Sequence, residues 1–191
     1  MAISESTLEL DQHTLLSADP AVVRFAVQPH WLSFWTVDSG GYWVRRRYAP
    51  DIIAELRGGR RVVIEVKGVT FANTEKWRLR ERDIRSAYAE HGLDFVVFTE
   101  REIRNEPRLS NCKQMLRHRG FGHDARHTLL VRRTISAATS PSTVSAILNG
   151  VAQMGGEVDP AFSVLMQFTL SGEVTIDLSA PLGDTSVVQW S

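Results

Sequence analysis

Residues 45–68 read RRRYAPDIIAELRGGRRVVIEVKG and place charged side chains within two short apolar runs. Asp51 follows Pro50 and opens the run IIAEL, while Glu65 and Lys67 stand two apart inside VVIEVKG. Burying a charged side chain in a strand costs free energy unless another group pairs with it. These three charged residues therefore indicate either a structural ion pair or a functional site.

The two apolar runs flank residues 57–59, Arg-Gly-Gly, which predicts an antiparallel hairpin. Side chains two apart in a strand point to the same face, so we expect Glu65 and Lys67 to share one. Asp51, at the start of the paired strand, is expected to reach the same place across the hairpin. Two acids and a lysine that converge at a sheet end predict a site for a hard cation, Mg²⁺ with Mn²⁺ as a substitute.

Such a cation would make water a better nucleophile and offset the charge of a phosphate. Lys67 would then orient the water or stabilise the developing negative charge. The alternative is an ordinary solvent-facing salt bridge between Glu65 and Lys67, with Asp51 as a turn residue, because E-x-K alone is common. The whole pattern of P-D, a hydrophobic run, E-V-K and a basic helix is more specific and favours the functional interpretation.

The composition excludes several classes of protein. The chain has 191 residues, of which 43% are hydrophobic, enough for one core or two small ones. It contains no run of about 18 apolar residues, so we expect no membrane span, and its polar N-terminus does not resemble a signal peptide. Cys112 is the only cysteine, which excludes an internal disulfide and a cysteine-based zinc cluster. We therefore expect a soluble protein of the reducing cytoplasm.

Charge is segregated along the chain. Of the 22 Lys and Arg residues, 21 lie between Arg45 and Arg133 among 12 acidic residues, which leaves a net charge of +9. Residues 134–191 have five acidic residues and no Lys or Arg. The middle segment is thus expected to meet a polyanion, and the change in charge predicts two domains, 1–133 and 134–191.

The order of the expected elements predicts an α/β fold. Strands followed by a charged crossover helix and another strand are typical of a mixed sheet flanked by helices. We expect helices at 4–17, 74–90 and 109–118, and strands at 22–27, 30–37, 42–48, 51–56, 60–67 and 94–99.

Several motifs together resemble a known family. The Pro50-Asp51 and Glu65-Val66-Lys67 pair resembles the PD-(D/E)xK nuclease superfamily, whose fold is the restriction-endonuclease-like mixed sheet. The closer similarity, over about residues 4–120, is to TnsA-like endonuclease subunits of heteromeric transposases. It is carried by the helix motif Ser6-Thr7-Leu8-Glu9, the stretch DPAVVRFAVQP at 19–29, RRYAPD at 46–51 and FVVFTE at 95–100.

The resemblance assigns roles to particular residues. It implies that Asp51 and Glu65 bind Mg²⁺, that Glu9 completes the metal site and that Lys67 is the catalytic lysine. Without the resemblance Glu9 is merely an exposed helix residue, and Glu5 or Asp11 could equally be chosen.

The resemblance also implies a biological role. A TnsA-like subunit of a prokaryotic cell cuts double-stranded DNA at the 5′ ends of a mobile element, beside a DDE-type transposase subunit and an AAA+ ATPase regulator. The alternative is a PD-(D/E)xK nuclease, or a nuclease-fold module that only binds nucleic acid or builds a structure, in a phage or defence assembly.

Basic and aromatic residues surround the expected site. The arginines and the lysine could form a solvated face, but their position favours contact with DNA phosphates. These candidates are Arg45, Arg46, Arg47, Lys76, Arg78 and Arg80. Three tryptophans are expected to pack in the core or on the sheet: Trp31, Trp35 and Trp43.

Two further signals have plain interpretations. The spacing of His118, His123 and His127 could suggest a metal, but a solvated basic loop is favoured because no cysteine or acid pair frames it. Gln28 could lie near the expected site, but a hydrogen bond at a strand end is favoured.

The C-terminal segment predicts a small winged-helix-like domain of two helices and a β-hairpin. Phosphate contacts supply most nonspecific affinity for DNA, and this segment has no basic side chain. We therefore expect residues 134–191 to dock a protein surface, either a basic segment of the transposition partner or the chain's own +9 segment.

Overall fold

The computed structural model describes residues 2–120 and 124–191, with side chains from Thr7 onward. The chain divides into two compact units, Met1–Leu16 with Ala21–Arg104, and Ser17–Pro20 with Asn105–Ser191. This boundary differs from the expected division at 133/134. The change in composition at Arg133 marks a change in charge, whereas residues 105–133 form helices that pack with the C-terminal segment.

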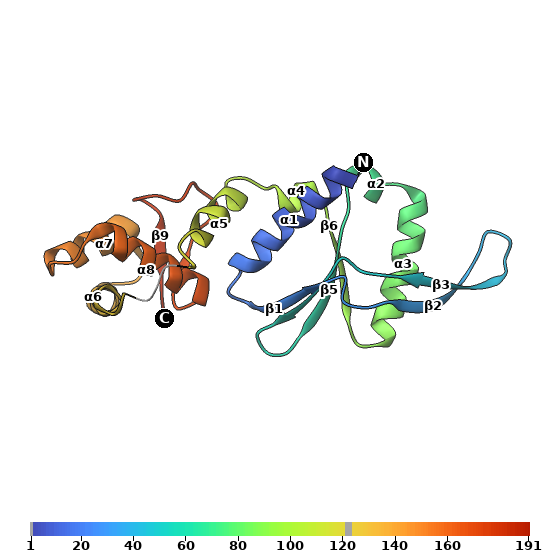
Figure 1. Ribbon diagram of the computed structural model, residues 1–191, viewed down its shortest axis with the longest axis horizontal. Coiled ribbons are helices and arrows are strands. Elements are labelled where there is room, and N and C mark those ends of the chain that lie inside the picture. The colour runs from blue at the N-terminus through green and yellow to red at the C-terminus, as the bar shows by residue number, and fades with distance from the viewer. Residues whose placement is uncertain (1, 121–123) are drawn as a thin grey trace. The chain divides into compact units, whose positions relative to one another are not determined.

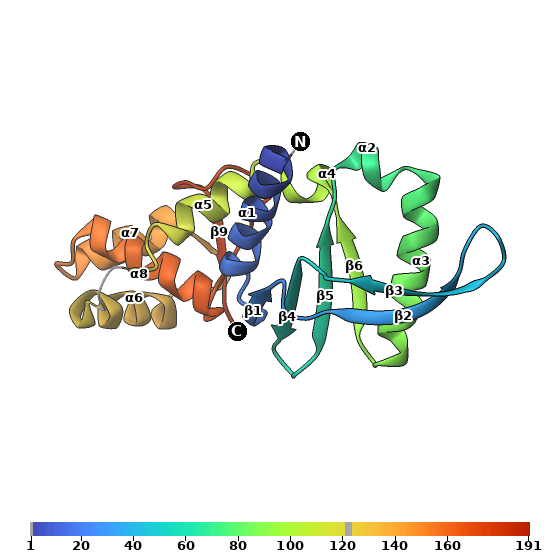
Figure 2. The same ribbon diagram turned by 45° about the vertical axis from the view of Figure 1, so that its right-hand side comes forward.

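A four-stranded mixed sheet forms the centre of the first unit, in the order β1-β4-β5-β6. The pairs β1–β4 and β4–β5 are antiparallel, and β5–β6 is parallel. Helices α1 and α3 lie on opposite sides of this sheet (Figures 1 and 2). The elements of this layer are α1 (Ala2–Ala18), β1 (Val22–Val27), β4 (Ile52–Leu56), β5 (Arg61–Val66), α2 (Val69–Ala72), α3 (Glu75–Glu90), β6 (Asp94–Phe98) and α4 (Glu100–Ile103).

The predicted hairpin is present and fixes the register of the sheet centre. Gly58 and Gly59 both have positive φ angles, 88° and 83°, which glycine adopts without the clash that a Cβ would cause. Ile52 pairs with Ile64 across the hairpin. This register places the residue before β4 opposite Glu65.

Helix α3 anchors one face of the sheet. Thr74 caps its N-terminus by accepting a hydrogen bond from the backbone N–H of Trp77. Trp77, Ile84 and Tyr88, the three residues spaced for one side of a helix, are all buried. They join a core with Leu32, Tyr48, Val63, Ala87 and Phe95.

Strands β2 (Leu32–Val37) and β3 (Trp43–Tyr48) form a separate two-stranded antiparallel ribbon that extends away from the sheet (Figure 2). The expectation that Trp31, Trp35 and Trp43 pack in the core or on the sheet is wrong. Trp31, Trp35 and Trp43 are 65%, 63% and 70% exposed. A ribbon of two strands has two faces, and here only the one that carries Leu32 and Phe34 packs against the core.

The second unit is mainly helical. Helix α6 begins at Ala125, is capped by Asp124 and lies in a segment where no helix was expected. Buried Leu130 and Val131 of α6 pack in a core with α7 and α8. The elements are α5 (Arg108–Leu116), α6 (Ala125–Ala137), β7 (Ser142–Thr143), α7 (Val144–Gln153), α8 (Val158–Ser171), β8 (Thr175–Ile176) and β9 (Val187–Gln189), with the strands in the order β7-β9-β8.

The two units do not reproduce the charge segregation of the sequence. The second unit combines the acidic residues of 134–191 with basic residues of 105–133, seven basic against eight acidic residues in all. The segment 134–191 is therefore not an isolated acidic body. Within the described ranges, no helix has the length and apolar character needed to span a membrane.

Candidate functional site

Three of the sequence-predicted residues meet at one end of the central sheet. Asp51 directly precedes β4, Glu65 lies near the end of β5, and Lys67 follows that strand. The Lys67 Nζ lies 2.7 Å from Glu65 Oε1 and 4.0 Å from Asp51 Oδ2. The ammonium group is therefore shared by two carboxylates that come from neighbouring strands.

The backbone holds the Asp51 carboxylate in place. The N–H of Val66 donates to Asp51 Oδ2 at 2.7 Å, so the side chain is fixed to the strand that carries Glu65. The N–H of Gln28 donates to the Asp51 carbonyl oxygen at 2.8 Å, which extends the pairing of β1 with β4. Gln28 thus hydrogen-bonds at a strand end, as expected, and does so with an unusual positive φ of 44°.

Glu65 is a buried carboxylate with two partners. Only 3% of the residue is exposed, and it lies between Lys67 and the hydroxyl of Tyr48, which donates to Oε2. Burial, and then the nearby charge of Asp51, raise the pKa of Glu65 to about 7, while Lys67 and the Tyr48 hydrogen bond oppose that rise. Near neutral pH the Glu65 carboxyl is therefore present in both its neutral and its ionised form.

Tyr48 is a site residue to which the sequence assigned no role. Burial and the charge of Glu65 raise the pKa of Tyr48, so its hydroxyl remains a donor. The ring packs edge-on against Tyr88 and Phe95, with centroids 6.3 Å and 6.2 Å away. The position of Tyr48 directly before Ala-Pro-Asp in the sequence was the signal that could have identified it as a site residue.

Aromatic packing from α3 holds Lys67. The Nζ lies 5.5 Å from the centre of the Trp77 ring, within the range of a cation–π contact. The side chain keeps 17% of its surface exposed. Lys67 is thus ordered on one side and reachable from solvent on the other.

The structure does not group Glu9 with the other acids. Among the residues with described positions, no three His, Cys, Asp or Glu side chains gather closely enough to hold a metal ion. Glu9 is partly exposed on α1, one turn before His13 on the same helix face. Burial lowers the pKa of His13 and the charge of Asp51 opposes that shift, so this face of α1 comes near the site.

Glu5 and Asp11 are the other acids of α1 that could take the role expected of Glu9. Asp11 forms an ion pair with Arg104, with 2.8 Å between Oδ2 and Nε. Glu5 has no described side chain. Of the three acids of α1, Glu9 is therefore the one whose helix face also carries His13.

The donor chemistry of the site fits a hard divalent cation. Asp51 and Glu65 offer carboxylate oxygens, the ligands that Mg²⁺ prefers. A bound cation would offset both causes that raise the pKa of Glu65, first its burial and then the charge of Asp51.

All six predicted DNA-contact residues are exposed and lie on two elements. Arg47 stacks over the Trp31 ring at 4.7 Å, and Arg80 lies 5.8 Å from the ring of Tyr48, the partner of Glu65. Strand β3 carries Arg45, Arg46 and Arg47, and α3 carries Lys76, Arg78 and Arg80.

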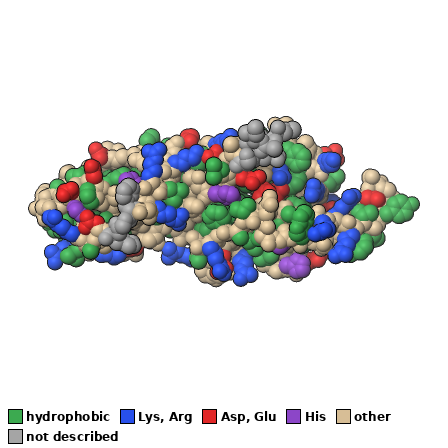
Figure 3. All heavy atoms as spheres, viewed as in Figure 1, with side chains coloured by type: hydrophobic (Ala, Val, Ile, Leu, Met, Phe, Trp, Pro, Cys, Tyr) green, Lys and Arg blue, Asp and Glu red, His purple; other side chains and the backbone are tan. Residues whose placement is uncertain are grey.

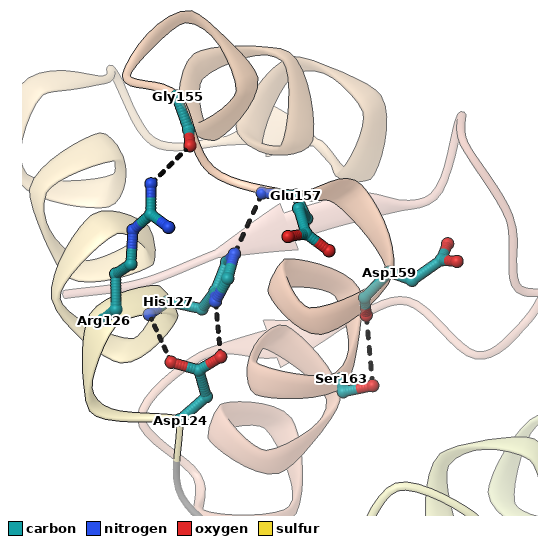
Figure 4. A network of polar contacts seen from close by, with 7 residues as sticks. All are labelled: Asp124, Arg126, His127, Gly155, Glu157, Asp159 and Ser163. Carbon is teal, nitrogen blue, oxygen red and sulfur yellow. Dashed lines mark hydrogen bonds and ion pairs between the residues drawn. The ribbon is translucent and has the colours of Figure 1, made fainter.

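The two described histidines of the second unit, His118 and His127, take part in hydrogen bonds within that unit. His127 is only 4% exposed, so the expectation of a solvated loop is wrong for this residue. Both of its ring nitrogens have partners: Nδ1 lies 2.6 Å from Asp124 Oδ2, and Nε2 accepts a hydrogen bond from the N–H of Glu157 (Figure 4). His118 bonds to Ser163. His123 lies outside the described residues. The helix capped by Asp124 accounts for His127 without a metal.

Comparisons of the sequence with protein-family models and with curated proteins gave no match, so the site is interpreted from its own geometry.

Proposed function

We propose that this chain is a Mg²⁺-dependent DNA endonuclease of the PD-(D/E)xK type. The observation that carries the proposal is the cluster of Asp51, Glu65 and Lys67 within 4.0 Å at the end of a mixed sheet. The sheet order, with β5 and β6 parallel and α1 and α3 on opposite sides, supports a restriction-endonuclease-like fold.

Asp51 and Glu65 would hold the Mg²⁺ ion, with Glu9 of α1 as the third acid and Mn²⁺ as a substitute. The bound ion would lower the pKa of water and offset phosphate charge. Lys67, anchored by Trp77, orients the attacking water and stabilises the negative charge that develops on the phosphate. Tyr48 keeps Glu65 in place, and the N–H of Val66 does the same for Asp51.

The basic residues of β3 and α3 would bind the DNA backbone beside this site. Phosphate contacts by such exposed side chains supply affinity and position the duplex without reading its sequence. Arg80 lies next to the ring of Tyr48, whose hydroxyl bonds to Glu65.

The proposed setting is a heteromeric transposase. In it the chain cuts the 5′ ends of a mobile element while a DDE-type transposase subunit cuts the other strand under an AAA+ ATPase regulator. The order helix, strand, helix, helix and β-hairpin from α6 to β9 supports a winged-helix-like second unit, which we propose contacts a protein partner.

The test is metal-dependent cleavage of supercoiled plasmid by the full chain, alone and with its transposase partner. We expect Asp51→Ala and Lys67→Ala each to reduce cleavage by at least about 100-fold, as loss of a group that acts on the transition state does. The matched controls are Asp94→Ala and Arg60→Ala, which remove an exposed ion pair from the same sheet and should cut normally.

A second readout separates metal binding from activity. Titration with Mn²⁺ by calorimetry should show a site in the full chain that Asp51→Ala weakens and Asp94→Ala does not. Unchanged cleavage in the Lys67→Ala variant would refute the assignment. Metal binding without cleavage in the assembled complex would favour the alternative, a nuclease-fold module of a phage or defence assembly. Genes for a recombinase and an ATPase beside the gene for this chain would favour transposition.

A further inference from the structure

The outer face of the β2–β3 ribbon carries large aromatic side chains that nothing in the described chain covers. Residues 31, 33, 35 and 37 are exposed and alternate with less exposed ones, as the two-residue period of a strand requires. Trp35 pairs with Arg45, and Val37 pairs with Trp43, so these four side chains lie on one face. Three exposed tryptophans within 13 residues form a far larger apolar surface than scattered single residues do.

The charge of this face is positive. Arg45 and Arg47 lie on it, and Arg47 stacks on Trp31. Between residues 29 and 48 the only acid is Asp38, whose Oδ1 accepts hydrogen bonds from two backbone N–H groups of the turn. Hydrophobic and basic side chains lie side by side over this ribbon (Figure 3). The face therefore suits a partner that combines negative charge with flat apolar surfaces.

A groove of about 580 Å³ lies between the ribbon and α3 and is lined by residues of both ribbon faces. Trp35 and Trp43 line it from the ribbon, and Arg82 and His91 line it from the helix. It also contains the acids Asp83 and Glu90, of which Asp83 already accepts a hydrogen bond from Thr36 and pairs with Arg82. The volume lies within the usual range for pockets that take a small organic group.

We propose that the outer face of the β2–β3 ribbon binds single-stranded DNA, with unpaired bases stacked on Trp35 and Trp43 and the backbone on Arg45 and Arg47. In a duplex each base is covered by its neighbours, whereas an unpaired base exposes both faces to an indole ring. The arginines supply the sequence-independent attraction to phosphate. This binding goes beyond the proposed cleavage and does not require it.

The experiment is fluorescence anisotropy of the full chain with a labelled single strand, in EDTA so that no cleavage occurs. We expect tighter binding to the single strand than to the matching duplex, and quenching of tryptophan emission on binding. Trp35→Ala and Trp43→Ala should each weaken binding roughly 5- to 100-fold, and Trp35→Phe should retain most of it. The double variant Arg45→Ala/Arg47→Ala should lower the slope of log affinity against log salt by roughly 1.4.

The controls separate this site from general charge and from the catalytic centre. Arg24→Ala/Arg60→Ala removes the same charge from exposed ion pairs elsewhere on the sheet and should leave the affinity unchanged. Lys67→Ala should abolish cleavage but not single-strand binding, so the two proposals fail separately. Equal affinity of both tryptophan variants and the parent chain, with folding verified by circular dichroism, overturns the inference. Binding to anionic lipid vesicles without binding to the single strand also overturns it.

Discussion

Replacing Tyr48 by phenylalanine removes one hydroxyl group and leaves the aromatic core of the first unit intact. The ring would keep its contacts with Tyr88 and Phe95. What is lost is the hydrogen bond to Glu65, a carboxylate that is only 3% exposed and cannot recruit bulk water instead. The variant therefore isolates the contribution of this bond.

The expected cost depends on the charge of Glu65. A buried hydrogen bond to an ionised group contributes about 1.5–3 kcal/mol, and one between neutral groups about 0.5–1.5 kcal/mol. The pKa of Glu65 is about 7, so the carboxyl is mainly ionised well above that value and mainly neutral well below it. Tyr48→Phe should thus lower the free energy of unfolding more at about pH 8.5 than at about pH 5.5.

Urea denaturation in EDTA, followed by tryptophan fluorescence, measures this cost. Four of the five tryptophans lie in the first unit, so the signal reports mainly on its unfolding. Tyr88→Phe is the matched control, because its buried hydroxyl bonds to His30 and not to a carboxylate. In a Glu65→Gln background the pH dependence of the Tyr48→Phe cost should disappear. A cost below about 0.5 kcal/mol at the higher pH would show that the bond contributes little.

Three further changes test other parts of the structure. The folded-state pKa of Glu65 exceeds its ordinary value of 4.5, so the neutral carboxyl stabilises the metal-free fold at low pH by at most about 3 kcal/mol. This stability should be lost as the pH rises towards about 7, and the Glu65→Gln variant, measured over the same pH series, should not show the loss. Gly150→Ala would place a Cβ 2.6 Å from Thr134 Cγ2 and should lower the free energy of unfolding, measured by thermal unfolding, by about 1–3 kcal/mol. Adding Thr134→Ser, which removes Cγ2, should relieve this cost. Asn111→Ala should lower the free energy of unfolding by about 1–3 kcal/mol, because the Asn111 amide forms hydrogen bonds with three backbone groups of residues 178–182. Unchanged hydrogen exchange of residues 178–182 in this variant would contradict the prediction.

The order of elements in the first unit could be predicted because each has a strong local signal. The β4–β5 hairpin has alternating apolar residues around Gly58-Gly59, and α3 has its three core residues at helical spacing. The contact between Glu65 and Lys67 followed from strand alternation alone. The Tyr48 hydroxyl could not be placed this way, because its bond to Glu65 depends on how the β2–β3 ribbon meets the sheet.

The errors arose where burial depends on neighbours. A tryptophan in a strand is core only if a second layer covers its face, and no described part of the chain forms such a layer over the outer face of the ribbon. Likewise, the fall in charge after Arg133 says nothing about packing, and α6 crosses that point with Leu130 and Val131 buried against later helices. Composition thus located a change in charge but not the border between the units.

The hydrogen bond from Val66 to Asp51 makes the site sensitive to strand register. A deletion of one residue inside β4 or β5 would turn every later side chain of that strand to the opposite face. It would separate Asp51 from Glu65 even if the hairpin still formed. Insertions at Gly58-Gly59 can be absorbed by the turn, so natural length variation in this hairpin should be confined to its tip.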